Sequence, residues 1–467
     1  MKRAKKLLLL LAVLAVIVAG YVIASRLTSE ETREESDVQS ISLLSVAKDS
    51  VSRLEWEYEG QTVVLEKSKG RWKYSGDEKF PLDSGIVNTM LSAVSAVNAS
   101  RSIDDAGSLS EYGLDKPECI IAVYSSELAD GKKLIIGSKN EVTGEYYVQT
   151  DGDSAVYLVD ESLRSAFAYT LMDLVAKEDI PYMSRIDALT VRTQEGSERI
   201  VYLQSSEGIT YTDVYTWFYE VESAGGKGYS PLSTDKVTRL HDKVRGLEWN
   251  SCADYSAEDE ELEQYGLLEP RASVTVEYSV SSAEKDKASS KFELLIGNEA
   301  DDGECYAMIK GSDMVYLIDS DIADALLAAD YASLRPDDVC LMDWDTVDSM
   351  DVEVDGSRIT IDFNRGEDGN LAYYVNGTEA DAAKVEELLA AINNLDAVDE
   401  RDNASPASEA EVVIVFRRNT EFFTNMTLRL SRYDSSHYLV SFIGQSRLLV
   451  ANSDVSYLKQ AFIALKP

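Results

Sequence analysis

The sequence contains little histidine, cysteine and positive charge, and each shortage argues against a class of site. Only two histidines and four cysteines occur among 467 residues. The cysteines form no Cys-x-x-Cys pair, and neither histidine lies at ligand spacing from any of them. Zinc centres and thioredoxin-like redox motifs depend on such spacing, so the sequence supports neither.

Three of the four cysteines, Cys119, Cys252 and Cys305, fall in or beside apolar runs that resemble strands, and Cys340 is the fourth. We expect those three to pack as small hydrophobic side chains. Because spacing alone does not pair cysteines, a disulfide outside the cytoplasm stays an alternative.

Basic residues are outnumbered: 45 lysines and arginines face 83 aspartates and glutamates, for a net charge of −38. A surface of this sign repels phosphate backbones, so nucleic acid is not an expected partner. The acidic surface favours a well-solvated exterior. Binding of cations or cationic peptides is the alternative.

Motifs of the common catalytic classes are missing. The sequence has no Gly-x-Ser-x-Gly, phosphate-binding loop or His-Glu-x-x-His. His241 falls on a predicted helix, where we expect it to be partly exposed, and His437 begins a predicted strand. The 26 tyrosines mostly alternate in strand-like runs, which favours sheet faces over a carbohydrate platform. The sequence therefore selects no catalytic residue, cofactor-binding residue or metal ligand, although a carboxylate pair among the many acids stays open.

The first 28 residues predict a cytoplasmic stub and a transmembrane anchor. Four basic residues precede the apolar run Leu7–Ala24, and a helix of that length rises about 27 Å, enough for a bilayer core. The positive flank is expected in the cytoplasm, and residues 29–49 form an acidic polar linker. A cleaved signal peptide is the alternative. In both cases the remainder of the chain is expected outside the cytoplasm.

A Tyr-Gly-Leu turn occurs twice, in "EYGLDKPECIIAVYSS" from Glu111 and in "QYGLLEPRASVTVEYS" from Gln264. The later segments "LIIG" and "LLIG" correspond as well, which indicates an internal repeat. We expect both turns to be structural. The glycine would cap a short helical turn at positive φ, the leucine would tuck under the sheet, and the proline would keep the chain extended.

Each repeat also predicts one amphipathic helix, and this helix identifies a third repeat that lacks the Tyr-Gly-Leu turn. The apolar residues are spaced by three, four and three positions, as one face of a helix requires. They are Val87, Met90, Val94 and Val97 in the first repeat, Val237, Leu240, Val244 and Leu247 in the second, and Val385, Leu388, Ile392 and Leu395 in the third. Capping residues are expected at Asp83, at Ser233 or Thr234, and at Thr378.

Strand pairs joined by acidic-Gly turns precede each helix, at Glu59-Gly60, Glu195-Gly196 and Asp355-Gly356. Four further strands and a short closing helix follow. Each unit is predicted as β-β-β-α-β-β-β-β-α, an α+β antiparallel sheet with its helices against one face. Three domains are expected, over residues 50–169, 184–329 and 345–465.

Two acidic segments resemble cation sites. Asp351–Asp362 has the acid and glycine spacing of a calcium loop, but its apolar residues alternate, which favours a hairpin. The loop "NEADDGE", Asn298–Glu304, is expected to be a solvated loop, because its counterpart in the first repeat does not keep the acids.

Together these motifs resemble a bacterial family described as domain of unknown function 4340 (DUF4340). The resemblance is carried by the basic start and apolar span, by Trp72 in "GRWKYS", by the Pro-led helix, and by "YGLDKP", "LIIG" and "YYVQTDGDSAVYLVD". It is close in the first repeat, good in the second and faint in the third. Family members are often encoded beside ABC-type export or gliding-motility transporter genes. The resemblance implies an accessory envelope role and transfers no catalytic residue.

We therefore expect a non-catalytic, single-pass scaffold or binding protein of the bacterial cell envelope, with a cytoplasmic N-terminus and an extracytoplasmic bulk. Its expected partners are the lipid bilayer, through Leu7–Ala24, and an envelope protein such as an ABC transporter subunit. No cofactor is expected. The alternatives are an enzyme that acts on envelope polymers through carboxylates, and a module that binds cations or cationic peptides.

Overall fold

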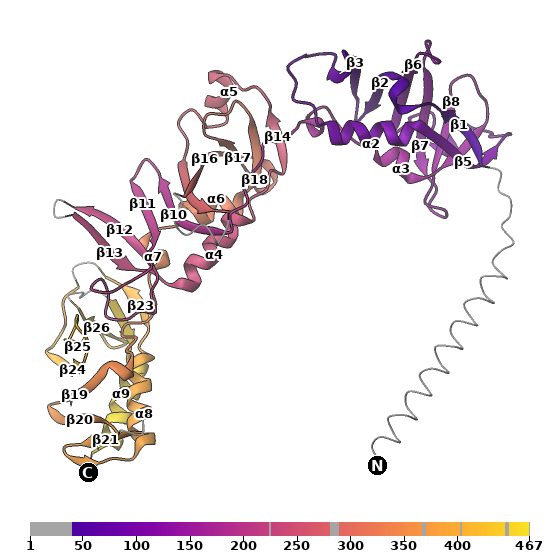
Figure 1. Cartoon of the computed structure of the whole chain (residues 1–467). Coiled ribbons are helices and arrows are strands. Elements are labelled where there is room, and N and C mark those ends of the chain that lie inside the picture. The colour runs from indigo at the N-terminus through magenta and orange to yellow at the C-terminus, as the bar shows by residue number, and fades with distance from the viewer. Residues whose placement is uncertain are drawn as a thin grey trace, which may run out of the picture. The chain divides into compact units, whose positions relative to one another are not determined.

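The computed structural model describes residues 40–223, 226–280, 289–366, 370–401, 404–443 and 448–466. Contacts divide the chain into two compact units, Met1–Glu178 and Asp179–Pro467. The first unit holds one sheet and the second holds two (Figure 1). Within the described ranges each sheet has nine strands and every strand pairing is antiparallel, so the predicted α+β class with three repeated antiparallel sheets is confirmed.

The first sheet has the order β1-β5-β9-β8-β7-β6-β2-β3-β4. Its strands are β1 (Ile41–Ser45), β2 (Val51–Tyr58), β3 (Gln61–Ser68), β4 (Arg71–Tyr74), β5 (Ala96–Ile103), β6 (Cys119–Ser125), β7 (Lys132–Lys139), β8 (Tyr146–Thr150) and β9 (Val156–Val159). Helix α2 (Ser84–Ser95) lies between β4 and β5, and α3 (Glu161–Ser165) follows β9.

The second sheet has the order β13-β12-β11-β10-β15-β16-β17-β18-β14. Its strands are β10 (Arg185–Arg192), β11 (Ser197–Tyr202), β12 (Trp217–Ser223), β13 (Gly226–Pro231), β14 (Ser251–Asp254), β15 (Ala272–Ser279), β16 (Ser290–Glu299), β17 (Glu304–Ile309) and β18 (Val315–Asp319). Its helices are α4 (Thr234–Arg245), α5 (Asp259–Gln264), α6 (Ser320–Leu327) and α7 (Tyr331–Leu334).

The third sheet has the order β22-β21-β20-β19-β24-β25-β26-β27-β23. Its strands are β19 (Val347–Val354), β20 (Ser357–Arg365), β21 (Leu371–Val375), β22 (Thr378–Glu379), β23 (Ala397–Glu400), β24 (Ala410–Arg418), β25 (Asn425–Arg432), β26 (His437–Ser441) and β27 (Leu448–Ala451). Its helices are α8 (Ala382–Asn393) and α9 (Asn452–Ala464).

The three sheets share eight strands in one order and differ in the ninth. From β5, β14 or β23, each sheet runs through the last four strands of its repeat and then through the first hairpin to β4, β12 or β21. The ninth strand is β1 beside β5 in the first sheet, but β13 and β22 extend the opposite edge in the other two. The predicted unit β-β-β-α-β-β-β-β-α therefore misses two strands of each repeat. They are the strand that directly follows the helix and the ninth strand at the edge of the sheet.

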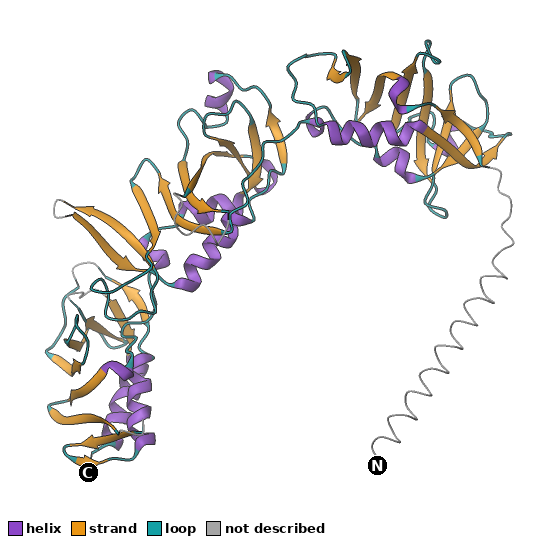
Figure 2. Cartoon of the chain, in the orientation of Figure 1, coloured by secondary structure: helices purple, strands orange, loops and turns teal. Residues whose placement is uncertain are grey.

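The helices pair within each repeat, as α2 contacts α3, α4 contacts α6 and α8 contacts α9. Figure 2 shows this plainly in the third repeat, where α8 and α9 lie side by side against the strands. All residues of the three predicted apolar stripes are buried. The last residue of each stripe, Val97, Leu247 or Leu395, lies just past the helix end and continues the core into the next segment.

Two of the predicted helix caps are confirmed and the third is wrong. The Asp83 carboxylate accepts hydrogen bonds from Gly85 N and Ile86 N, and Ser233 Oγ accepts one from Lys236 N. In the third repeat Asp381 caps α8 instead of Thr378. Thr378 of β22 pairs with Val375 of β21, so the chain is still extended there.

The prediction for His241 is also wrong, because this side chain is buried. Its ring packs edge-on against Trp217 of β12, with ring centroids 4.5 Å apart. Burial lowers the pKa of His241 to about 4, so the ring is neutral at neutral pH. All four cysteines are buried free thiols, and Cys119, Cys252 and Cys305 lie on strands as expected. Burial raises the pKa of the Cys119 thiol to about 12.

The predicted calcium-like segment is a hairpin. β19 and β20 pair from Ser349 to Asp362 around Asp355 and Gly356, both at positive φ, as in a two-residue hairpin turn. The Asp351 carboxylate accepts hydrogen bonds from Arg358, Arg417 and Thr360 Oγ1. The hydrogen bond from Arg417 is the largest cause that lowers the pKa of Asp351 to about 2.

The predicted anchor Leu7–Ala24 lies outside the described residues, as does most of the predicted linker at 29–49. The last part of that linker is not a linker, because Ile41–Ser45 forms β1 and pairs with β5. In the part of the chain that the structure describes, no helix has the length and apolar character to cross a membrane.

Candidate functional site

The Tyr-Gly-Leu corner has the structure that its sequence predicts. Gly113 has φ 69° after a short 3-10 turn, Leu109–Tyr112, and Gly266 has φ 68° after α5. Leu114 and Leu267 are 7% and 3% exposed. In each repeat the leucine amide donates back across the turn, to Leu109 O or Leu262 O. Both corners are therefore built for packing.

The corner also explains the glycine of the "LIIG" and "LLIG" segments. A Cβ added at Gly137 would lie 2.1 Å from Tyr112 O, and one at Gly297 would lie 2.2 Å from Tyr265 O. The carbonyl of the corner therefore sits directly on the glycine of the neighbouring strand. The Tyr-Gly-Leu turn and the glycine of the later strand therefore recur together because they contact each other. The acidic loop from Asn298 adjoins it, since Asn298 N donates to Tyr265 O.

The third repeat closes the same place with charged groups. Val412 pairs with Val354 as Cys119 pairs with Tyr58, in each case just before the hairpin turn. Val412 also pairs with Leu430, so the next residue, Ser431, takes the place of Gly137.

Beside Ser431, Glu411 accepts hydrogen bonds from Arg432, Lys459 Nζ and Tyr438 Oη. Burial alone would raise the pKa of Glu411, but these hydrogen bonds outweigh it and lower the pKa to about 2.

A hollow of the second unit forms where an insertion of the second repeat meets the third repeat. In the first repeat β3 and β4 are joined by Lys69 and Gly70, whereas residues 203–216 join β11 and β12. This segment reaches the third repeat through Tyr211. Its hydroxyl oxygen accepts a hydrogen bond from Leu341 N at 2.8 Å, and its ring lies edge-on to Phe442 at 5.3 Å. Burial raises the pKa of Tyr211, which keeps its hydroxyl neutral.

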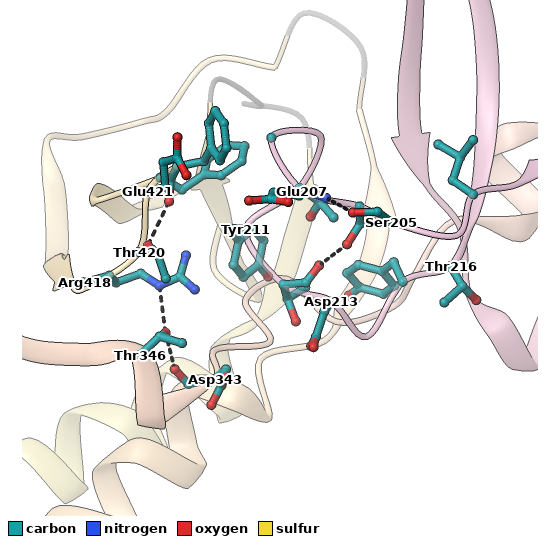
Figure 3. A pocket seen from close by; sticks show the side chains of 18 of the residues that line it. Ser205, Glu207, Tyr211, Asp213, Thr216, Asp343, Thr346, Arg418, Thr420 and Glu421 are labelled. Atoms are coloured by element: carbon teal, nitrogen blue, oxygen red, sulfur yellow. Dashed lines mark hydrogen bonds between the residues drawn. The ribbon is translucent and has the colours of Figure 1, made fainter.

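The hollow has a volume of about 410 Å³. Figure 3 shows Ser205, Glu207 and Asp213 of the second repeat facing Arg418 and Thr420 of the third. Its walls combine hydroxyl groups, aromatic rings and charges. The lining residues are 203–208, 210–213, 215, 216, Asp343, Thr346, Arg418 and 420–423.

In this hollow the positive charge is buried and the negative charges are exposed. The buried wall carries Arg418, which is 8% exposed, whereas Glu207, Asp213, Asp343 and Glu421 are all exposed. Arg418 Nε donates to Thr346 Oγ1 at 2.9 Å, and that hydroxyl donates to Asp343 O at 2.6 Å. Burial lowers the pKa of the Arg418 guanidinium from its ordinary value. Among the described residues no carboxylate forms an ion pair with it.

The lining of the hollow contains no histidine, cysteine or lysine. Over the described ranges, no cluster of three or more histidine, cysteine or acidic side chains is arranged to hold a metal ion. Of the described carboxyl groups with a shifted pKa, Asp396 alone is shifted upward, first by burial and then by Asp338. Asp396 does not line the hollow.

The sequence did not predict this hollow. The length of the connection between β11 and β12, compared with the two-residue turn of the first repeat, is the signal that marks the insertion. Nothing in the local pattern indicates that this connection contacts a strand more than two hundred residues away. His437 begins β26 as predicted and contacts Asp434, and it does not line the hollow.

Comparison with known proteins identifies a family model described as domain of unknown function (DUF4340), which matches residues 72–212 and 226–411. No curated protein and no solved structure matches the chain. The match includes both Tyr-Gly-Leu corners and ends before Arg418. The hollow is thus built partly from residues inside the matched ranges and partly from residues beyond them.

Proposed function

Since the chain belongs to the DUF4340 family, and since a hollow between its second and third repeats is lined by hydroxyl, aromatic and charged groups, we propose that it is a non-catalytic scaffold or binding protein of the bacterial cell envelope. In this proposal Leu7–Ala24 anchors the chain in the membrane and the three sheets lie outside the cytoplasm. Its partner is an envelope complex, such as an ABC-type transporter to which it is an accessory.

The observation that carries the proposal is the contact between the second and third repeats. The ends of the insertion at 203–216 pair with each other, as Leu203 N donates to Thr216 O. Its middle places Tyr211 against the core of the third repeat and leaves a hollow beside it. Sheet edges add further binding surface, because an exposed edge strand offers unpaired amides and carbonyls to an extended partner segment.

The test is recovery of partners from native membranes. Full-length chain with a C-terminal tag is captured after mild solubilisation and compared with a variant in which residues 203–216 are replaced by Lys-Gly, the turn of the first repeat. Lys69→Asn, in a tight turn that asparagine tolerates, is the matched control. We expect an envelope complex with the parent and the control, and its loss with the replaced loop. Recovery of no envelope protein while the transporter is present would contradict the proposal.

Topology is tested separately by labelling. Val142 is almost fully exposed and the four native cysteines are buried, so Val142→Cys provides a single reactive thiol. A membrane-impermeant maleimide should label it in intact spheroplasts. Lys2→Cys should be labelled only after lysis. Labelling of Val142→Cys only after lysis would place the sheets in the cytoplasm and overturn the proposed location.

The alternative of an enzyme acting on envelope polymers requires two carboxyl groups across a cleft, with one pKa raised so that it acts as an acid. Asp396, the carboxyl group whose pKa is raised, lies near Asp337 and Asp338 and does not line the hollow beside Arg418. No specific observation favours this function over binding.

A further inference from the structure

Arg418 is an exception among the three repeats. Register pairs it with Val347, just before a β-bulge, as Ser125 pairs with Val51 and Tyr278 with Ile186. The same buried position therefore holds serine, tyrosine and arginine in the three sheets. A fold that is built twice without a cation at this place does not require one.

A guanidinium in this position is costly unless its donors are satisfied. Removing a charge from water carries a large penalty, which an opposite charge or several hydrogen bonds must offset. The Nε atom of Arg418 donates to Thr346 Oγ1, and in Figure 3 the terminal nitrogens of Arg418 point toward the side of the hollow where Tyr211 and Asp213 lie. Its Nη groups are consequently available to an acceptor that enters from outside. Paired N–H donors of this kind suit a carboxylate or another planar anion.

The rest of the lining narrows the class of ligand. Four carboxylates at the exposed rim disfavour a ligand of net negative charge and favour one that carries a positive group outside its anionic group. The lining hydroxyls of Thr346 and Thr420 already donate to Asp343 O and Phe422 O, so their oxygen atoms can only accept hydrogen bonds from N–H groups of a ligand. The volume of about 410 Å³ falls within the range of about 300–1,000 Å³ typical of small-ligand sites.

We propose that this hollow binds a short peptide, with the free C-terminal carboxylate on Arg418 and the amino group toward Asp213 and Glu421 at the rim. The assignment rests on the proposed binding function and names its ligand. A zwitterionic peptide matches both the buried cation and the exposed acids. Its side chains meet the rings of Tyr215 and Phe422, which also line the hollow.

The test uses the full-length chain in detergent and saturation-transfer NMR with two probes: an equimolar pool of tripeptides with free C-termini, and the same pool amidated. The free pool should give clear signals, and the amidated pool should bind about tenfold or more weakly, because a charge-assisted pair is lost. Arg418→Ser, which installs the residue of the first repeat, should abolish the preference. Equal binding of both pools, or no binding of either, would overturn the proposal.

A rim variant keeps the test decisive if Arg418→Ser folds poorly. Asp213→Asn combined with Glu421→Gln changes two exposed residues, so the fold is retained. This variant should weaken binding of the free-amine pool severalfold and leave an N-acetylated pool unchanged. Equal effects on both pools would contradict the orientation. Inorganic phosphate that binds through Arg418 while peptides do not would assign a simple anion site and overturn the peptide assignment.

The outcome is separable from that of the scaffold proposal. Intact partner capture without peptide binding removes only this ligand. Peptide binding without partner capture removes the scaffold role and leaves a peptide-binding protein.

Discussion

In the first and second repeats the corner before the second group of strands is closed by a glycine under a carbonyl, whereas the third repeat closes it with ion pairs. Gly137 and Gly297 lie so close to the corner that a Cβ at either position would clash with a carbonyl oxygen of the corner. The third repeat has Ser431 at that place and Glu411 bound by Arg432 and Lys459 nearby. Eight strands nevertheless keep the same order in all three sheets.

This difference separates what the fold needs from what one repeat has acquired. Features present in every sheet, such as the bulge after the first residue of β2 and its counterparts Ile186 and Val347, belong to the scaffold. Features present once, namely the 203–216 insertion and Arg418, meet each other at the hollow between the second and third repeats. We therefore assign the repeated features to folding and the single ones to binding.

The largest effect is expected at the corner leucine. Leu267→Ala should lower the free energy of unfolding of the second unit by about 2–5 kcal/mol, because it empties a buried site. The neighbour Leu268 is 52% exposed, so Leu268→Ala is the matched control and should change stability by less than about 0.5 kcal/mol. Urea unfolding of the full chain measures both. Similar losses for the two variants would show that the corner leucine is not a packing residue.

A smaller effect, confined to the third repeat, is expected from Glu411→Gln. Loss of the hydrogen bonds to charged partners should cost about 1.5–3 kcal/mol at pH 7. The folded pKa of Glu411 lies near 2, below the ordinary value of 4.5. Its stabilisation is therefore complete above pH 4.5 and is lost as the pH falls toward 2.

The parent and Glu411→Gln should accordingly converge in stability over that interval of pH. Hydrogen exchange of the third sheet follows the effect, with the exposed Glu409→Gln as control. A difference that stays constant down to a pH of about 2 would show that the charge of Glu411 does not stabilise the corner.

The two corner glycines allow a finer comparison. Alanine at either forces a side chain into positive φ, at a cost of about 1 kcal/mol or more. A Cβ at Gly113 meets the Ser138 backbone nitrogen at 2.7 Å, whereas one at Gly266 meets the Asn298 side-chain amide, which is able to rotate away. Gly113→Ala should therefore destabilise its repeat more than Gly266→Ala does. Thermal unfolding of the two variants checks the order, and the reverse order would show that the Ser138 backbone yields more easily than the Asn298 side chain.

Local patterns were sufficient to predict the hairpins, the three helices and the corner. Glu59-Gly60 and Asp355-Gly356 adopt positive φ because the turn connects adjacent strands, and all the information lies within a few residues. Strands β5, β14 and β23 were missed for the opposite reason. Each pairs with the last strand of its repeat, and β14 and β23 have only four residues.

Burial was harder to predict where it depends on another element. His241 follows Leu240 on α4 and has the sequence position of a helix flank, yet Trp217 of β12 covers it. Arg418 has the sequence position of an exposed strand end, yet it is buried, as Ser125 and Tyr278 are at the same register. Residues 203–216 then make it one wall of a hollow. No pattern within either segment encodes such a contact, since it is fixed by packing against an element that is distant in sequence.

Arg418→Ser tests the central claim most directly, because it replaces the residue found once by the residue that the first repeat has in the same register. We predict an unfolding free energy within about 1 kcal/mol of the parent, since removing a buried charge without an ion-pair partner offsets the packing lost with the side chain, together with loss of the preference for free C-termini. A large loss of stability with peptide binding intact would show that Arg418 serves the fold, and would contradict its assignment to binding.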